Sequence, residues 1–224
     1  MATVNYTLSR NNADATFDNS EFDNPQNVRD KDAEFAAAGT DRTHIFTASY
    51  VYELPFARKA TEGWRKALLR GWQIAGITRV ESGPAVRLGA DNCNYGGWCT
   101  DALRPDQIGD PAAGNQNGLL WFNPAAFAPA PAREYGNASV APFRLPGRHQ
   151  WDVALSKNVA LGGTKRLQFK ADLINAFNHT QFLDVNTHCS GTTTCGPTGG
   201  PAAFGQVRST RPPREIQLGV RVDW

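Results

Sequence analysis

The last ten residues alternate between apolar and polar positions, and this alternation constrains the fold more than any other feature of the chain. The apolar positions are Ile216, Leu218, Val220, Val222 and Trp224, and one residue of the other, mainly polar set stands between each of them and the next. Successive side chains of a β-strand point to opposite faces, so a period of two predicts a strand with one apolar face. A tilted strand of about 11 residues rises roughly 25 Å, the height of the apolar band of a membrane barrel.

The terminal aromatic also favours a barrel, because aromatic girdles border the apolar band, whereas the ends of soluble sheets usually continue into frayed polar residues. Alternation alone fits a half-buried strand of a soluble sheet equally well. The choice between a membrane barrel and a soluble sheet therefore depends on the rest of the chain.

Five earlier segments repeat the alternation, so the sequence predicts an all-β chain of about six antiparallel strands. The expected strands lie near residues 2–9, 43–54, 71–82, 150–160, 165–177 and 214–224. The rows opposite the apolar ones carry the charges of Glu53, Arg79, Glu81, Asp152, Lys170 and Asp172. A water-filled lumen tolerates such charges, whereas the dry core of a sandwich does not. The pattern favours an up-and-down transmembrane β-barrel segment.

Long and shorter connections alternate between these strands, as they do in outer-membrane barrels with long external loops and short periplasmic turns. The long ones cover residues 10–40, about 84–148 and 179–214. Residues 55–70 and the turn at 162–164 are shorter, and residues 61–69 have helical spacing. We expect the external loops to be irregular and mobile. Lys157 interrupts the apolar row of the fourth strand, and we place it near a membrane interface.

Composition excludes several classes of protein. A net charge of +2 provides no basic face for nucleic acid. A mean hydropathy of −0.45 is compatible with a barrel, whose lumen and loops are polar. No signal peptide is recognisable at the N-terminus. The histidines are scattered without partners for a catalytic triad or metal pair, so we expect no enzyme activity, cofactor or metal site.

The four cysteines form two pairs of equal spacing, Cys93 with Cys99 and Cys189 with Cys195. Both pairs lie in predicted external loops, where oxidising conditions favour local disulfides. A zinc site is the alternative, since His188 adjoins Cys189, but the spacing is longer than in typical zinc motifs. We therefore predict two disulfides.

Five phrases, in the expected order over nearly the whole chain, resemble the C-terminal barrel of TonB-dependent receptors of the Oar-like subgroup. They are Asp41-Arg42-Thr43-His44-Ile45-Phe46, Tyr52-Glu53-Leu54-Pro55-Phe56, Gly71-Trp72-Gln73-Ile74-Ala75-Gly76, Phe122-Asn123-Pro124-Ala125-Ala126-Phe127 and Asn175-Ala176-Phe177-Asn178-His179-Thr180-Gln181-Phe182. The final strand also looks like the closing strand of that family. The resemblance implies a barrel of about 22 strands with a plugged lumen.

The resemblance further implies ligand uptake driven by TonB, in the outer membrane of a Gram-negative-type bacterium. Implied partners are outer-membrane lipid and, through a full-length receptor, TonB and the barrel-assembly machinery; the ligand is not implied. Six strands are fewer than the roughly eight that a closed membrane barrel needs, and we expect no plug domain within this chain. We therefore expect an incomplete barrel, the fragment of a longer exported protein.

Two alternatives remain open. The first is an outer-membrane adhesin or structural barrel that does not transport and that uses its long loops as an interaction surface. The second is a soluble carbohydrate-binding β-sandwich, with Trp98 and Trp121 as stacking platforms. The fate of the apolar rows separates the second from a membrane barrel, because a sandwich buries them between two sheets.

Overall fold

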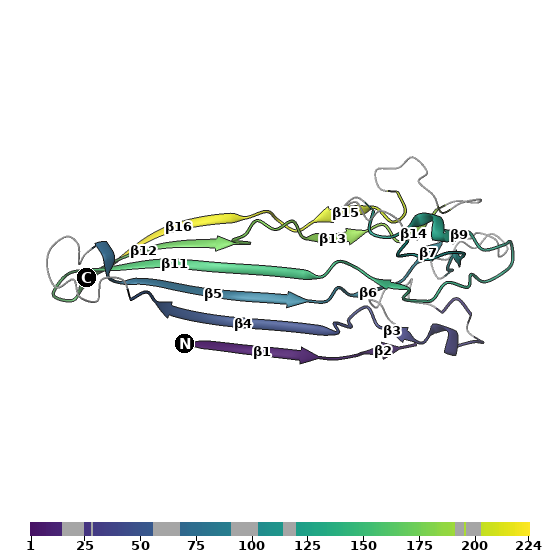
Figure 1. Cartoon of the computed structure of the whole chain (residues 1–224), viewed down its shortest axis with the longest axis horizontal. Helices are drawn as coiled ribbons and strands as arrows, with labels where there is room; N and C mark the ends of the chain where they lie inside the picture. Colours follow the sequence, from purple (N-terminus) through teal and green to yellow (C-terminus); the bar gives the residue numbers. More distant parts are fainter. Residues whose placement is uncertain are drawn as a thin grey trace.

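A six-stranded antiparallel sheet is the main feature of the fold. The computed structural model describes residues 1–14, 25–27, 29–55, 68–90, 103–113, 120–190, 195 and 203–224. The strands follow the order β1-β4-β5-β11-β12-β16, so each one pairs with the next main strand along the chain (Figure 1). They are β1 (Ala2–Leu8), β4 (His44–Glu53), β5 (Trp72–Glu81), β11 (Arg148–Gly162), β12 (Lys165–Ile174) and β16 (Glu215–Asp223). The predicted all-β, up-and-down arrangement is confirmed.

Each of the six expected ranges coincides with one of these strands, with ends that differ by at most three residues, and β11 extends two residues beyond its expected range at each end. The largest difference is at β12, which ends at Ile174 because Asn175 has a φ of 52°. Asparagine tolerates this left-handed conformation better than most residues. The Asn175 side chain also donates to the carbonyl of His179 and accepts from its N–H, at 3.2 and 3.1 Å, so it closes a tight turn.

Both chain termini lie at one end of the sheet, and the three long connections lie at the other (Figure 1). At the terminal end, β11 and β12 are joined by a tight turn in which Gly162 and Gly163 have φ values of 105° and 61°. The predicted turn at 162–164 is therefore confirmed. Most of the predicted helical segment 61–69 lies outside the described residues. In the described part of the chain, no helix is long and apolar enough to cross a membrane.

Gly163→Ala should destabilise the β11–β12 turn by roughly 1–2 kcal/mol, because a β-carbon is strained at positive φ. A β-carbon at Gly163 would meet no other atom within 4 Å, so the cost is one of backbone conformation alone. Gly219→Ala is the matched control, since Gly219 in β16 is equally open but does not have a positive φ. Urea unfolding in lipid vesicles should show a loss for the first variant only. An equal loss in both would contradict the explanation.

Most described residues of the long connections lie outside helices and strands, as predicted for irregular loops, but these connections also pack into an ordered structure that the prediction did not include. Ten short strands pair there, joining segments that are distant in the sequence. They are β2 (Asn12–Ala13) with β3 (Ala36–Ala37), β6 (Ala85–Val86) with β10 (Phe143–Arg144), β7 (Gly89–Ala90) with β14 (His188–Cys189), β8 (Asp106–Gln107) with β9 (Phe127–Ala128), and β13 (Phe182–Val185) with β15 (Val207–Thr210). Two 3-10 turns, η1 (Asp32–Glu34) and η2 (Pro124–Ala126), accompany them.

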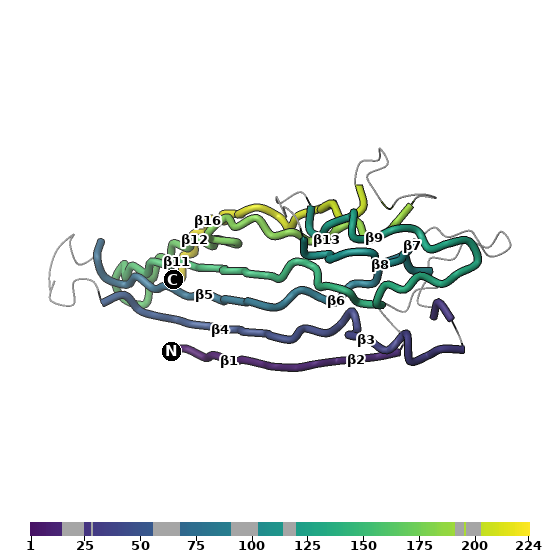
Figure 2. Tube along the Cα trace, turned by 45° about the vertical axis from the view of Figure 1, so that its right-hand side comes forward, coloured from purple at the N-terminus to yellow at the C-terminus, as the bar shows by residue number. Residues whose placement is uncertain are grey.

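These segments gather beyond one end of the sheet and enclose a hydrophobic core of their own (Figure 2). We call it the loop core, and it comprises Leu88, Ala90, Phe122, Ala126, Phe127, Ala138, Val185, Cys189, Cys195 and Phe204. Phe122 lies at its centre, with ring centroids 4.4 Å from Phe143 and 4.9 Å from Phe204. Among the described residues, all buried hydrophobic side chains lie in this loop region and none in the six main strands.

Candidate functional site

The pairing register places the apolar rows of all six strands on one face of the sheet, which we call the apolar face. One line of paired positions crosses the whole sheet through Ala2, Tyr50, Gly76, Val153, Leu173 and Ile216. No second sheet covers this face in the described part of the chain. The soluble sandwich interpretation is therefore wrong, because its apolar rows would be buried between two sheets.

The predicted residues of the last strand are strongly exposed on the apolar face. The exposed fractions of Ile216, Leu218, Val220, Val222 and Trp224 are 58%, 76%, 65%, 48% and 89%. A contiguous apolar surface of this kind marks contact with a membrane or a partner protein. The absence of buried hydrophobic residues from the six strands indicates that the partner of this face lies outside the described structure.

The opposite face, which we call the polar face, carries almost all charges of the six strands. Pairs two residues apart form salt bridges along three strands, Arg79–Glu81 at 2.7 Å, Lys170–Asp172 at 3.0 Å and Arg221–Asp223 at 2.8 Å. A hollow of about 550 Å³ lies over this face and is bordered by residues of all six strands, among them Thr3, Ser49, Ile77, Asp152, Asp172 and Gln217. The salt-bridged rows suit contact with water, whereas the hollow itself also has apolar lining residues, among them Val51, Ala75 and Ile174.

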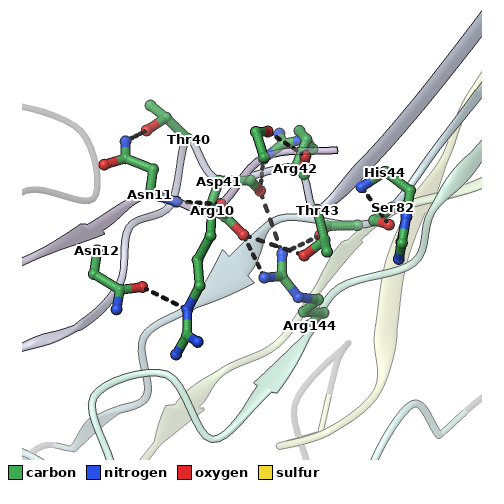
Figure 3. A network of polar contacts seen from close by, with 12 residues as sticks. Arg10, Asn11, Asn12, Thr40, Asp41, Arg42, Thr43, His44, Ser82 and Arg144 are labelled. Carbon is green, nitrogen blue, oxygen red and sulfur yellow. Dashed lines mark hydrogen bonds and ion pairs between the residues drawn. The ribbon is translucent and has the colours of Figure 1, made fainter. Parts of the chain in front are cut away.

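A polar network ties the long connections together where β4 and β5 enter the loop region (Figure 3). Asp41 is at its centre and its side chain is fully buried. The Asp41 carboxylate accepts hydrogen bonds from the N–H of Asn11 at 2.6 Å and from the guanidinium of Arg144. Arg144 also donates to the carbonyl of Gly83 at 3.1 Å. One carboxylate thus links the connections that follow β1 and β5.

Burial raises the pKa of Asp41, but the hydrogen bonds from Arg144 and Asn11, the charge of Arg144 and a bond from Thr43 together lower it below its usual 3.8. A carboxyl with a lowered pKa contributes stability that is present above its ordinary pKa and is lost as the pH falls through the folded value. The network should therefore weaken only below pH 3.8.

Hydrogen exchange at the Asn11 amide tests this acid dependence. Its protection, corrected for intrinsic exchange, should fall on acidification below pH 3.8, because the acceptor Asp41 becomes protonated. The amide of Trp121, which donates to the carbonyl of Gly205, has no carboxylate acceptor and is the control. Asp41→Asn should abolish the pH dependence at Asn11. A fall in protection that survives this substitution would contradict the assignment.

A second buried ion pair lies deeper in the loop region. Arg104 donates to the carboxylate of Glu34 at 2.7 Å, and both side chains are at most 4% exposed. Arg87 approaches the same carboxylate to 4.0 Å. Gln26 connects the partners, since its N–H donates to Glu34 at 3.1 Å and its side-chain oxygen accepts from the N–H of Arg104 at 2.9 Å.

Cys189 and Cys195 form a disulfide with an S–S distance of 2.01 Å, and both belong to the loop core. This pairing confirms one predicted disulfide and excludes the zinc alternative for Cys189. The other predicted pair, Cys93 and Cys99, lies outside the described residues, as does Trp98. Trp121 is partly buried against the loop core and donates its indole N–H to the carbonyl of Arg144 at 2.8 Å. Its predicted role as a sugar platform belonged to the soluble sandwich interpretation.

Residues 1–217 match the family described as "Outer membrane beta barrel domain". The chain belongs to this family. No curated protein and no solved structure matches the chain. The barrel domain therefore lies in the outer membrane, and lipid is the partner that its exposed apolar face requires. Outer-membrane barrels have long external loops and short periplasmic turns, which predicts that the loop region is external and the β11–β12 turn periplasmic.

Sequence reasoning missed the two ion pairs that organise the external end of the barrel domain. Asp41 stands within a phrase that carried the family resemblance, but its partner Arg144 is 103 positions away. Glu34 and Arg104 each have an apolar neighbour, Phe35 and Leu103, which is a weak signal of burial. The sequence positions of these charged residues do not indicate which of them pair with each other.

Proposed function

We propose that the chain forms part of the barrel wall of a TonB-dependent receptor that takes up a ligand across the outer membrane. The main support for this proposal is that the charged residues of the six strands share one face of the sheet. Among the charged residues of the six strands, all except Lys157 and the turn residue Lys165 project from the polar face. Charged side chains facing inward suit a hydrated lumen through which a polar ligand can move.

The resemblance to Oar-like receptors supports energy coupling by TonB and insertion by the barrel-assembly machinery, both acting on the full-length receptor. The exposed edges of β1 and β16 support a larger barrel, because unpaired backbone groups are costly in lipid. We assign the chain no catalytic step. Its contribution is to bound the ligand path and to hold the external loop region in place.

An outer-membrane adhesin is the second candidate, and the packed external end favours it. A loop region with its own core, two buried ion pairs and a disulfide is a defined surface for a partner. Such a surface can also capture a ligand before uptake. Energy dependence therefore distinguishes an adhesin from a transporter.

The decisive experiment compares three strains of the bacterium that carries the gene: the parent, a deletion of this gene and a deletion of TonB. Mass spectrometry of the spent medium should reveal a compound that the parent removes and that both deletion strains leave behind. Attachment to surfaces is measured in parallel. If only the deletion of this gene has an effect, and the effect is on attachment, the chain is an adhesin and the transport proposal is wrong.

A further inference from the structure

A hollow of about 750 Å³ interrupts the apolar face near the periplasmic end of the sheet. Its volume is in the range of small-molecule sites in proteins. Its lining is almost wholly hydrophobic and includes Trp72, Leu155, Val159, Phe169, Leu218 and Val220. Because this face contacts lipid, a hydrocarbon chain is the natural occupant of its apolar part.

One cation, Lys157, stands in this apolar lining. Register pairs it with Trp72 and Phe169, both in apolar rows, and its exposed fraction is only 6%. Lys170 also borders the hollow, but it belongs to the polar face and forms a salt bridge with Asp172. Lys157 is therefore the charge that faces the hydrocarbon side of the wall.

The contacts of Lys157 leave its charge unbalanced. Its ammonium donates to the carbonyl of Arg70 and lies 5.4 Å from the centroid of the Trp72 ring. Among the described residues, no carboxylate lies within 4.0 Å of it. An ammonium has three donor hydrogens, and a buried charge is costly unless an opposite charge accompanies it. The hollow thus has an apolar lining and an ammonium that no carboxylate of the described residues accompanies.

We propose that this hollow binds an anionic phospholipid, with its phosphate beside Lys157 and an acyl chain along Leu155, Phe169 and Leu218. The position along the strand supports a headgroup contact. Lys157 lies opposite Trp72, the first residue of β5, and tryptophan side chains of barrels gather at the membrane interface. The proposal depends on the place of the chain in the outer membrane and not on TonB-dependent transport.

Native mass spectrometry of the full chain in detergent tests the proposal, with phosphatidylglycerol and phosphatidylcholine of identical acyl chains added in equal amounts. The wild type should retain phosphatidylglycerol roughly fivefold more than phosphatidylcholine, the effect of about one basic side chain at a membrane surface. Lys157→Gln should remove this preference, and Lys157→Arg should keep it. Arg221→Gln is the control, because Arg221 lies on the polar face of β16 outside the hollow, and it should leave the preference unchanged.

A second variant fills the hollow without changing its charge. Ala171 borders the hollow on the apolar face, so Ala171→Phe should reduce the retention of both lipids at least severalfold. This variant decides the matter if Lys157→Gln does not fold. Equal retention of the two lipids by the wild type would overturn the proposal, as would an unchanged preference in Lys157→Gln. Full lipid retention by Ala171→Phe would also overturn it.

Discussion

Leu218→Arg should destabilise the folded protein in a bilayer by roughly 2–4 kcal/mol, the cost of an arginine that faces lipid near the middle of a barrel strand. Leu218 projects from the apolar face of β16 and is 76% exposed, so few protein atoms would shield the new charge. At 1.4 kcal/mol per factor of ten, the ratio of folded to unfolded protein should fall by about 30- to 700-fold.

Gln217, the residue before Leu218, provides a control because it lies on the opposite face of the sheet. Gln217 projects from the polar face, where it pairs with Asp172 of β12. Gln217→Arg should therefore change the free energy of unfolding by less than about 0.5 kcal/mol, as most exposed substitutions do. Urea unfolding in lipid vesicles, followed by the shift of the folded band on unheated gels, measures both variants. Equal losses would show that the apolar face does not contact lipid.

The main strands could be predicted because their signal is local. Each strand carries its own period of two, and the register then aligns rows that were already visible in the sequence, such as Val153, Leu173 and Ile216. Lipid contacts apolar side chains without requiring a specific partner residue. The alternation within one strand is therefore sufficient to indicate which of its side chains face the lipid. The six main strands and the faces of their side chains could therefore be predicted without knowledge of contacts between distant residues.

The loop region could not be predicted, because its signal is distributed over the chain. Phe122 gains its place in the loop core only when Phe143, from a later part of the same connection, and Phe204, from another connection, pack against it. Short pairs such as β7 with β14 contain two residues per strand, too few for any period to be visible. A composition rich in glycine and proline is typical of turns whether or not the connections pack together. The expectation of irregular loops followed from that ambiguity.

Glu34→Ala should open the loop region with little effect on the membrane sheet. The substitution leaves the buried Arg104 guanidinium, which is 4% exposed, without its carboxylate. Removing one partner of a buried ion pair typically costs about 3–5 kcal/mol. If the loop region opens as a local unit, its cleavage by protease should accelerate by roughly a hundred- to several-thousand-fold.

Limited proteolysis of the protein in lipid vesicles measures this opening, and the gel shift of the folded barrel reports on the sheet in the same samples. Glu34→Met combined with Arg104→Met is the informative companion, because replacing both charges by apolar side chains can restore stability. Glu134→Ala is the control, since Glu134 is an exposed acid of the same region. Cleavage as slow in Glu34→Ala as in the control would show that the pair does not hold the loops closed. Loss of the folded band would show that loops and sheet unfold together.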